Sequence, residues 1–106
     1  MENRVRLGGI LHAREPLRYS PAGIPIVDAT IAHRSGQSQA GHLKEVEFEA
    51  RVVAVDATAL RLGVLPLGAQ VRMSGFLAPR RRHARSLVLH VTELETIERN
   101  SNSERG

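Results

Sequence analysis

The sequence predicts an all-β fold, a barrel of five strands with one short helix between the third and the fourth strand. Apolar and polar residues alternate with a period of two in five separate segments, which is typical of strands that bury one face. A stretch of about two helical turns lies between the third and fourth segments. The 106 residues, 42% of them hydrophobic, suffice for one modest core but not for a second, catalytic domain.

The first strand is expected over residues 4–11. One face of it carries Val5, Leu7, Gly9 and Leu11. The alternation stops over residues 12–23, where two prolines and a glycine predict a long exposed connection rather than a tight hairpin turn. A second strand is expected over residues 26–34, and Val27, Ala29 and Ile31 occupy its apolar face.

A loop rich in Gly, Ser and Gln is expected over residues 35–42, before the third strand. This strand has the clearest alternation, with one apolar face formed by Val46, Phe48, Ala50, Val52 and Ala54. Its opposite face carries Glu45, Glu47 and Glu49 and is expected to be wet. The same alternation predicts that Phe48 belongs to the core.

Asp56 is expected to cap a helix of about two turns, which Gly63 and Pro66 end. The fourth and fifth strands are expected over residues 71–77 and 87–92. Phe76 has the opposite parity to the apolar residues of its strand, so it is expected to face outward. The polar residues 100–106 predict a disordered tail after a domain that covers residues 1–99.

The order strand, strand, strand, helix, strand, strand is that of an OB-fold, a five-stranded Greek-key barrel. Other small β-barrels share the number of strands, so the order alone does not distinguish them. An OB-fold binds oligonucleotides on its second and third strands and on the loops that join strands 1–2 and 4–5. Candidate binding residues are therefore expected in these loops.

Basic charge is concentrated in the loop between the fourth and fifth strands. Residues 79–85 carry four basic and no acidic side chains, whereas residues 1–78 carry nine basic and seven acidic ones. The four are Arg80, Arg81, Arg82 and Arg85. Clustered guanidinium groups bind a phosphate backbone with little sequence preference and strong salt dependence. The alternatives are a solvated charge run and a docking site for an acidic protein, and biased genomic composition also favours arginine.

Three further residues are expected to flank the same groove. Arg18 and Tyr19 lie in the loop between strands 1 and 2, and Arg34 ends the second strand. Tyr19 is suited to stack on a base or to lie on the barrel surface, and Arg34 to contact nucleic acid or to pair with Glu47. Against tight DNA binding, the chain has one Tyr, two Phe and no Trp, and the glutamates of the third strand repel phosphate.

Catalytic and metal chemistry have no support in the sequence. There is no Cys, and the five His show no metal-binding spacing, so we expect no enzyme activity, cofactor, metal site or small-molecule substrate. Neither an apolar run of about 20 residues nor a leader pattern is present, so no membrane association is expected. The lack of Cys suits a reducing compartment, and a cytoplasmic location is expected.

Several stretches resemble primosomal replication protein N, the PriB family of bacterial replication restart. The resemblance covers residues 2–98. Its most specific parts are residues 2–7, 16–18, 20–25, 33–35, 40–41, 75–76 and 87–90. It implies a homodimer of OB-folds, similar to single-strand binding protein, that binds single-stranded DNA and bridges the PriA helicase to the next primosome factor. The implied DNA contacts are Arg18, Arg34, Lys44 and the arginines of the 4–5 loop.

The sequence departs from this family at the expected DNA surface. Glu47 stands where the family has a stacking tryptophan, and His42 stands where an aromatic residue also occurs. The leading hypothesis is a single-stranded DNA-binding accessory protein of the primosome. The alternatives are a dimeric OB-fold adaptor for other proteins, with weak or incidental nucleic-acid binding, and an RNA-binding OB protein.

Overall fold

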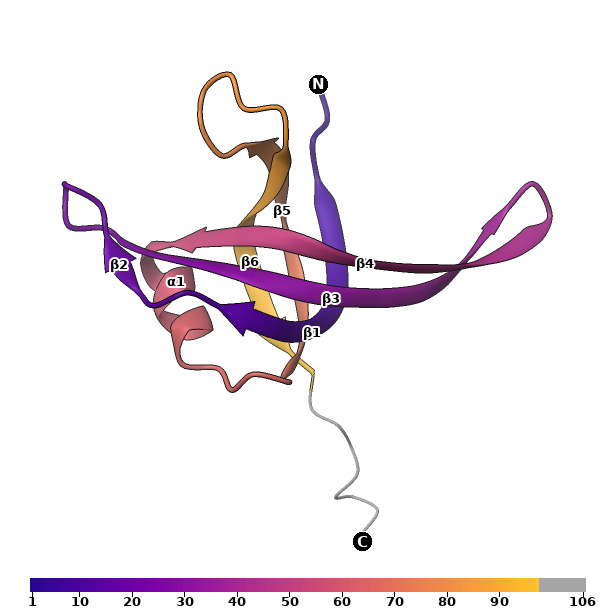
Figure 1. The fold of residues 1–106 in the computed structure, drawn as a ribbon, viewed down its shortest axis with the longest axis horizontal. Coiled ribbons are helices and arrows are strands. Elements are labelled where there is room, and N and C mark those ends of the chain that lie inside the picture. The colour runs from indigo at the N-terminus through magenta and orange to yellow at the C-terminus, as the bar shows by residue number, and fades with distance from the viewer. Residues whose placement is uncertain (98–106) are drawn as a thin grey trace, which may run out of the picture.

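The computed structural model describes residues 1–97, which form six strands and one helix (Figure 1). The elements are β1 (Val5–Arg14), β2 (Arg18–Tyr19), β3 (Pro25–Gln39), β4 (His42–Val55), α1 (Asp56–Gly63), β5 (Gln70–Pro79) and β6 (Leu87–Thr96). The tail predicted at residues 100–106 lies outside the described residues. No helix in residues 1–97 is long and apolar enough to cross a membrane.

All six strands belong to one sheet, in the order β1-β5-β6-β4-β3-β2. An additional pairing between β1 and β3 closes the five long strands into a barrel. β1 divides its length between two neighbours: Val5 to Ile10 pair with β5, and Ile10 to Arg14 pair with β3. β4 and β6 run parallel, and the other pairs are antiparallel. The predicted five-stranded barrel is confirmed.

The helix follows the fourth strand of the structure rather than the third. The reason is the two-residue strand β2, which forms inside the connection predicted at residues 12–23 and pairs with the start of β3. α1 closes one end of the barrel, where Ala59 and Leu62 are fully buried. The barrel interior holds the apolar faces predicted for the strands, with Val27 and Ile31 of β3 and Val71 and Met73 of β5 among its buried residues.

Asp56 does not cap the helix as predicted. Val55 is the N-cap residue, and no side chain of the described residues caps the helix, while Asp56 is the first helical residue and has a φ of 59°. The pairing of β4 with β3 continues as far as Val55, so the strand passes directly into the helix. The Asp56 carboxylate still lies in the first turn, where the helix dipole favours negative charge.

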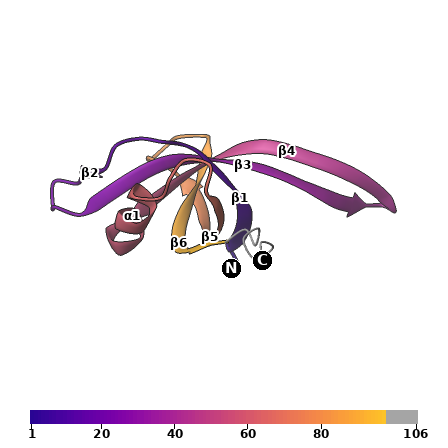
Figure 2. The same cartoon turned by 90° about the horizontal axis from the view of Figure 1, so that it is seen from below.

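The loop predicted at residues 35–42 is instead the end of a long hairpin. β3 and β4 pair without interruption from Ile26–Val55 to Gln39–His42. Only Ala40 and Gly41 form the turn, with φ of 53° and 79°, which suits the right-handed twist of a two-residue hairpin. The end of this hairpin projects away from the barrel (Figures 1 and 2). The Gly, Ser and Gln residues of this segment adopt strand conformation because the backbone N–H and C=O groups of β3 and β4 form hydrogen bonds with each other.

The projection also explains why Phe48 is not in the core. Its side chain is 45% exposed, although it shares the parity of buried Val52. The alternation is correct, but no other element within residues 1–97 buries this part of β4, so the apolar face lies open. The Phe48 ring instead contacts the His33 ring, with 4.8 Å between the ring centroids.

Candidate nucleic-acid interface

A groove lined by arginines lies beneath the loop that joins β5 to β6. Its volume is about 680 Å³. The charged residues that line it are Glu15, Asp28, Arg51, Arg80, Arg81 and Arg82, and we call it the basic groove. With His neutral, four positive charges face two negative ones. Such an excess raises the local concentration of an anionic ligand, and the effect is strongest at low salt.

The loop over residues 80–86 carries most of this charge. It leaves β5 after Pro79 and enters β6 at Leu87, and it stands clear of the barrel (Figure 1). Arg81, Arg82 and Arg85 are exposed, and they form no ion pair with any other residue of the part of the chain that the structure describes. Their guanidinium groups are therefore available to a ligand. Inside the loop, the backbone N–H of Ala84 donates to the carbonyl of Arg81 at 3.0 Å.

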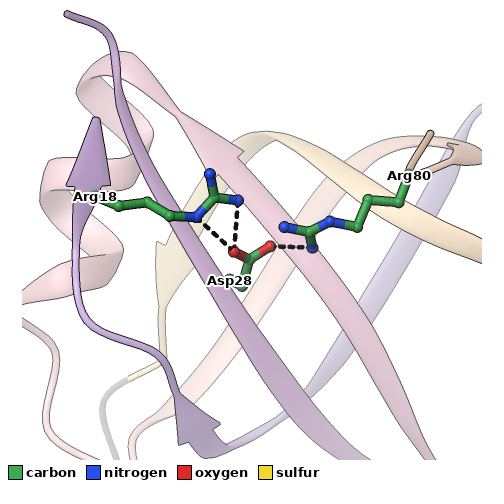
Figure 3. A network of polar contacts seen from close by, with 3 residues as sticks. All are labelled: Arg18, Asp28 and Arg80. Carbon is green, nitrogen blue, oxygen red and sulfur yellow. Dashed lines mark hydrogen bonds and ion pairs between the residues drawn. The ribbon is translucent and has the colours of Figure 1, made fainter. Parts of the chain in front are cut away.

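Arg18 and Arg80 meet at the carboxylate of Asp28, on β3 (Figure 3). Arg18 donates to Oδ2 through Nη2 at 2.9 Å and through Nε at 3.3 Å. Arg80 donates to Oδ1 through Nη1. The Asp28 side chain is only 14% exposed, so it is paired with two cations at the wall of the groove. We call these three residues the Asp28 cluster.

The ionisation of the Asp28 cluster follows from these contacts. Burial raises the pKa of Asp28, but the hydrogen bonds and charges of Arg80 and Arg18 outweigh burial and hold this pKa below its usual value. In return, the hydrogen bond to Asp28 raises the pKa of Arg80. Asp28 is therefore ionised at neutral pH, and the cluster carries a net charge of about one positive unit.

The remaining predicted residues divide between two regions. Tyr19 is 61% exposed on β2, next to Arg18, so its ring is free to contact a ligand. Arg34 and Lys44 lie on the β3–β4 hairpin and do not line the basic groove. Arg34 pairs with Glu45 and with Glu47, each at 3.0 Å, which is the carboxylate pairing that the sequence left open.

Asp28 and Arg51 belong to the groove but were not among the predicted site residues. They lie on neighbouring strands, where Asp28 pairs with Val53 and Arg51 pairs with Thr30. A signal was present in the sequence, because each is a charged residue at a position opposite in parity to the apolar face predicted for its strand. The alternation places both on the outer face, but it does not show that this face lies beside the arginine loop.

A second, more apolar groove lies between β1, β3 and β4. Its volume is about 480 Å³, and we call it the Phe48 groove. Its lining consists of Ile10, Ala32, His33, Arg34, Glu47, Phe48 and Glu49. His33 is fixed there on both sides: its Nδ1 donates to the carbonyl of Gly8 at 2.7 Å, and its Nε2 lies 2.7 Å from the Ser35 hydroxyl. This groove adjoins the part of β1 that has only β5 as a neighbour.

Within residues 1–97, no group of three or more His, Cys, Asp or Glu side chains could hold a metal ion.

Phe76 is 40% exposed, in agreement with its predicted outward orientation. Its ring is stacked on that of His90, with 5.0 Å between the centroids and 3° between the planes. Of the Tyr and Phe residues, Tyr19 is the most exposed, and it directly follows Arg18 of the Asp28 cluster.

Comparison with known proteins gives consistent results. A family model described as another single-strand binding protein family matches residues 3–93. Over 95 residues the chain is 34% identical to replication restart protein PriB of Nitrosomonas europaea. This match covers 90% of the present chain and 88% of the relative. Among solved structures, PriB from Ralstonia solanacearum has a TM-score of 0.84 and 33% identity, covering 92% of this chain and all of the other.

The fold is also shared with a larger protein. The wild-type single-stranded DNA binding protein from Thermus aquaticus has a TM-score of 0.76 and 25% identity. This likeness covers 94% of the present chain and 52% of the Thermus aquaticus chain. The five-stranded barrel and its single helix are therefore an OB-fold.

Proposed function

Because this chain belongs to the PriB family of replication restart proteins, we propose that it binds single-stranded DNA as an accessory protein of the replication-restart primosome in the cytoplasm. The observation that carries this proposal is the basic groove. Four arginines line it, at the position between the 1–2 and 4–5 connections where OB-folds bind oligonucleotides. Three exposed arginines of the 80–86 loop have no acidic partner within residues 1–97 and can pair with phosphates.

Electrostatic attraction supplies most of the affinity in this mechanism. Arg51, Arg81 and Arg82 bind phosphates in the groove, and Arg85 extends the contact along the loop. Tyr19 stacks on a base near the Asp28 cluster, which works with any sequence because every base has a π-face. A longer strand also reaches Arg34 and Lys44 on the hairpin. This second region binds more weakly, because Glu45, Glu47 and Glu49 are exposed there.

The proposal is tested by fluorescence anisotropy of a labelled oligo-dT strand at several salt concentrations. We expect Arg81→Gln/Arg82→Gln to weaken binding about tenfold at low salt and to reduce the slope of log K against log salt by about 1.4, since each phosphate contact contributes about 0.7. Arg4→Gln/Arg61→Gln is the matched control, because it removes the same charge from two exposed residues outside the groove. Equal losses in both variants, or no binding by the unaltered protein, contradict the proposal.

We further propose that the protein bridges the PriA helicase to later primosome components, as its family membership implies. A second candidate function is that of a dimeric adaptor with only weak DNA binding. The exposed glutamates of β4 favour it, because they give the hairpin an acidic face and one of them stands where the family has a stacking tryptophan. A helicase pull-down with a variant that neutralises Arg80, Arg81, Arg82 and Arg85 together, and that shows no detectable DNA binding, separates the two functions. Retention of the helicase after loss of DNA binding supports the adaptor.

Homodimer formation is the third part of the proposal. From Val5 to Gly9, one edge of β1 pairs with β5 and the other has no strand neighbour among residues 1–97. An unpaired edge of this kind can pair with the same edge of a second copy. The Phe48 groove lies beside this edge, and its exposed apolar residues Ile10 and Phe48 would be covered in such a pair.

A further inference from the structure

Both connections that flank the basic groove are tied to β3 through one carboxylate. We infer that Asp28 is a positioning residue for DNA binding, which holds Arg18 and Arg80 as one phosphate-binding unit. This inference rests on the proposed function and deepens it. Arg18 and Arg80 lie 62 residues apart in the chain, and Asp28 is the group that both contact (Figure 3).

The contacts of Asp28 leave both arginines able to bind a ligand. A guanidinium group has five N–H donors in a fixed planar arrangement. Two nitrogens of Arg18 and one of Arg80 donate to Asp28, so each group keeps donors for a phosphate. The two side chains remain 47% and 33% exposed, whereas the carboxylate between them is 14% exposed. The arginines therefore screen the carboxylate and present the positive side of the cluster.

Arg80 also provides the tie between the 80–86 loop and β3. It is the first residue of the 80–86 segment, next to the end of β5. Within residues 1–97, its bond to Asp28 is the only hydrogen bond or ion pair between this segment and the remainder of the chain. Arginine side chains and loops lose conformational freedom when a ligand orders them, and a side chain that is already held loses less. Asp28 thus reduces the ordering that DNA must impose.

This role predicts a result opposite to that expected from charge alone. Replacing Asp28 by a neutral residue raises the net charge of the groove by one unit, and simple electrostatics then predicts tighter DNA binding. If Asp28 positions the two arginines, the same change releases them and binding weakens. The direction of the effect therefore distinguishes a positioning carboxylate from one that only repels phosphate.

Asp28→Asn and Glu15→Gln form a matched pair for this test. Both residues line the basic groove and both changes remove one negative charge, but Glu15 has no side-chain ion pair or hydrogen bond among the described residues. With a labelled oligo-dT strand at low salt, we expect Glu15→Gln to bind as tightly as the unaltered protein or up to about twofold tighter, and Asp28→Asn to bind about fivefold more weakly. Thermal unfolding checks that both variants are folded.

Asp28→Asn binding as tightly as Glu15→Gln, or more tightly, overturns the inference while the proposed function stands. If the unaltered protein does not bind oligo-dT even at low salt, the proposed function fails, and the inference fails with it. The two failures are therefore distinct.

A second comparison leaves Asp28 in place and remains decisive if Asp28→Asn does not fold. Arg80→Gln and Arg82→Gln each remove one positive charge from the same loop and the same groove. Only Arg80→Gln also cuts the tie to β3. We expect Arg80→Gln to reduce oligo-dT affinity at least threefold more than Arg82→Gln. A difference of about this size corresponds to the entropic cost of ordering one long side chain. Equal losses contradict a positioning role for the Asp28 cluster.

Discussion

Asp28 illustrates how a carboxylate stays ionised at a mostly buried position beside a proposed phosphate site. Two guanidinium groups from different connections donate to its two oxygens, and their charges outweigh the effect of burial on its pKa. A carboxylate paired in this way differs in its consequences from the exposed glutamates of β4. The Asp28 carboxylate offsets one of the two positive charges of Arg18 and Arg80, but it holds both guanidinium groups in a defined orientation.

The lowered pKa predicts how Asp28 contributes to stability as the pH changes. A carboxylate whose pKa is lower in the folded state stabilises the fold above its unfolded pKa of about 3.9, and this contribution is lost as the pH falls through the folded pKa. At pH 7 we expect Asp28→Asn to lower the free energy of unfolding by about 1.5 kcal/mol, the lower end of the range typical of hydrogen bonds to a charged group, because both arginines remain partly exposed to water. Urea titrations at pH 7, 4 and 2 measure this difference.

We expect the difference between the unaltered protein and Asp28→Asn to be largest at pH 7 and to shrink below pH 4. Arg18 and Arg80 remain protonated over the whole range, so the carboxylate alone accounts for the change. A difference that stays constant down to pH 2 contradicts this explanation.

At the scale of elements, two close approaches between strands explain how five strands close into so small a barrel. Gly9 lies where β1 changes its partner, and a Cβ there would lie 2.5 Å from the carbonyl oxygen of Ala32. Gly75 lies at the irregularity in the pairing of β5 with β6, and a Cβ there would overlap the carbonyl group of His90. A bulge of this kind bends a strand, and a glycine allows the neighbouring backbone to approach.

Gly75→Ala is therefore expected to destabilise the protein by about 3 kcal/mol, because the backbone of β5 or β6 must shift to remove the overlap. Gly8→Ala is the control on a neighbouring strand, since its Cβ would lie 3.6 Å from the nearest backbone oxygen, an ordinary contact distance. We expect its effect to stay below about 1 kcal/mol. Denaturant unfolding measures both, and similar midpoints for the two variants would show that β5 and β6 separate more easily than their packing indicates.

At the scale of the whole molecule, the barrel presents two different surfaces. The basic groove carries an excess of positive charge, and the Phe48 groove beside the unpaired edge of β1 combines exposed apolar residues with Arg34, Glu47 and Glu49. The two grooves share no lining residue, so the proposed dimer contact and the proposed DNA site use different side chains.

We expect the protein to sediment as a dimer. We expect Phe48→Asp to raise the dimer dissociation constant at least tenfold, since a buried aromatic side chain commonly contributes that much to the stability of an interface. Leu67→Asp is the control: it is also an exposed apolar residue, 59% accessible, but lies outside the Phe48 groove. Sedimentation equilibrium over a range of concentrations measures both. A monomeric unaltered protein, or equal effects of the two changes, excludes this interface.

The five long strands, the helix and much of the core can be predicted from the amino-acid sequence alone. Val27 and Ile31 are buried as their alternation indicates, and the arginine loop lies between β5 and β6 as predicted. These features are local, because side-chain direction in a strand depends only on position along the chain. The stretches similar to PriB identified the family for the same reason, since they can be compared residue by residue.

Which of these surfaces are covered, and which residues meet, depends on how the strands close into the barrel. Alternation puts Phe48 on the apolar face of β4, but it does not show that the hairpin leaves the barrel and exposes that face. Nor does it show that Asp28 joins Arg18 to Arg80: Arg18 lies in the neighbouring strand β2, but Arg80 follows Asp28 by 52 residues and reaches it only after the sheet has closed. A sequence pattern records the direction of each side chain, whereas contact and burial depend on where the other strands lie.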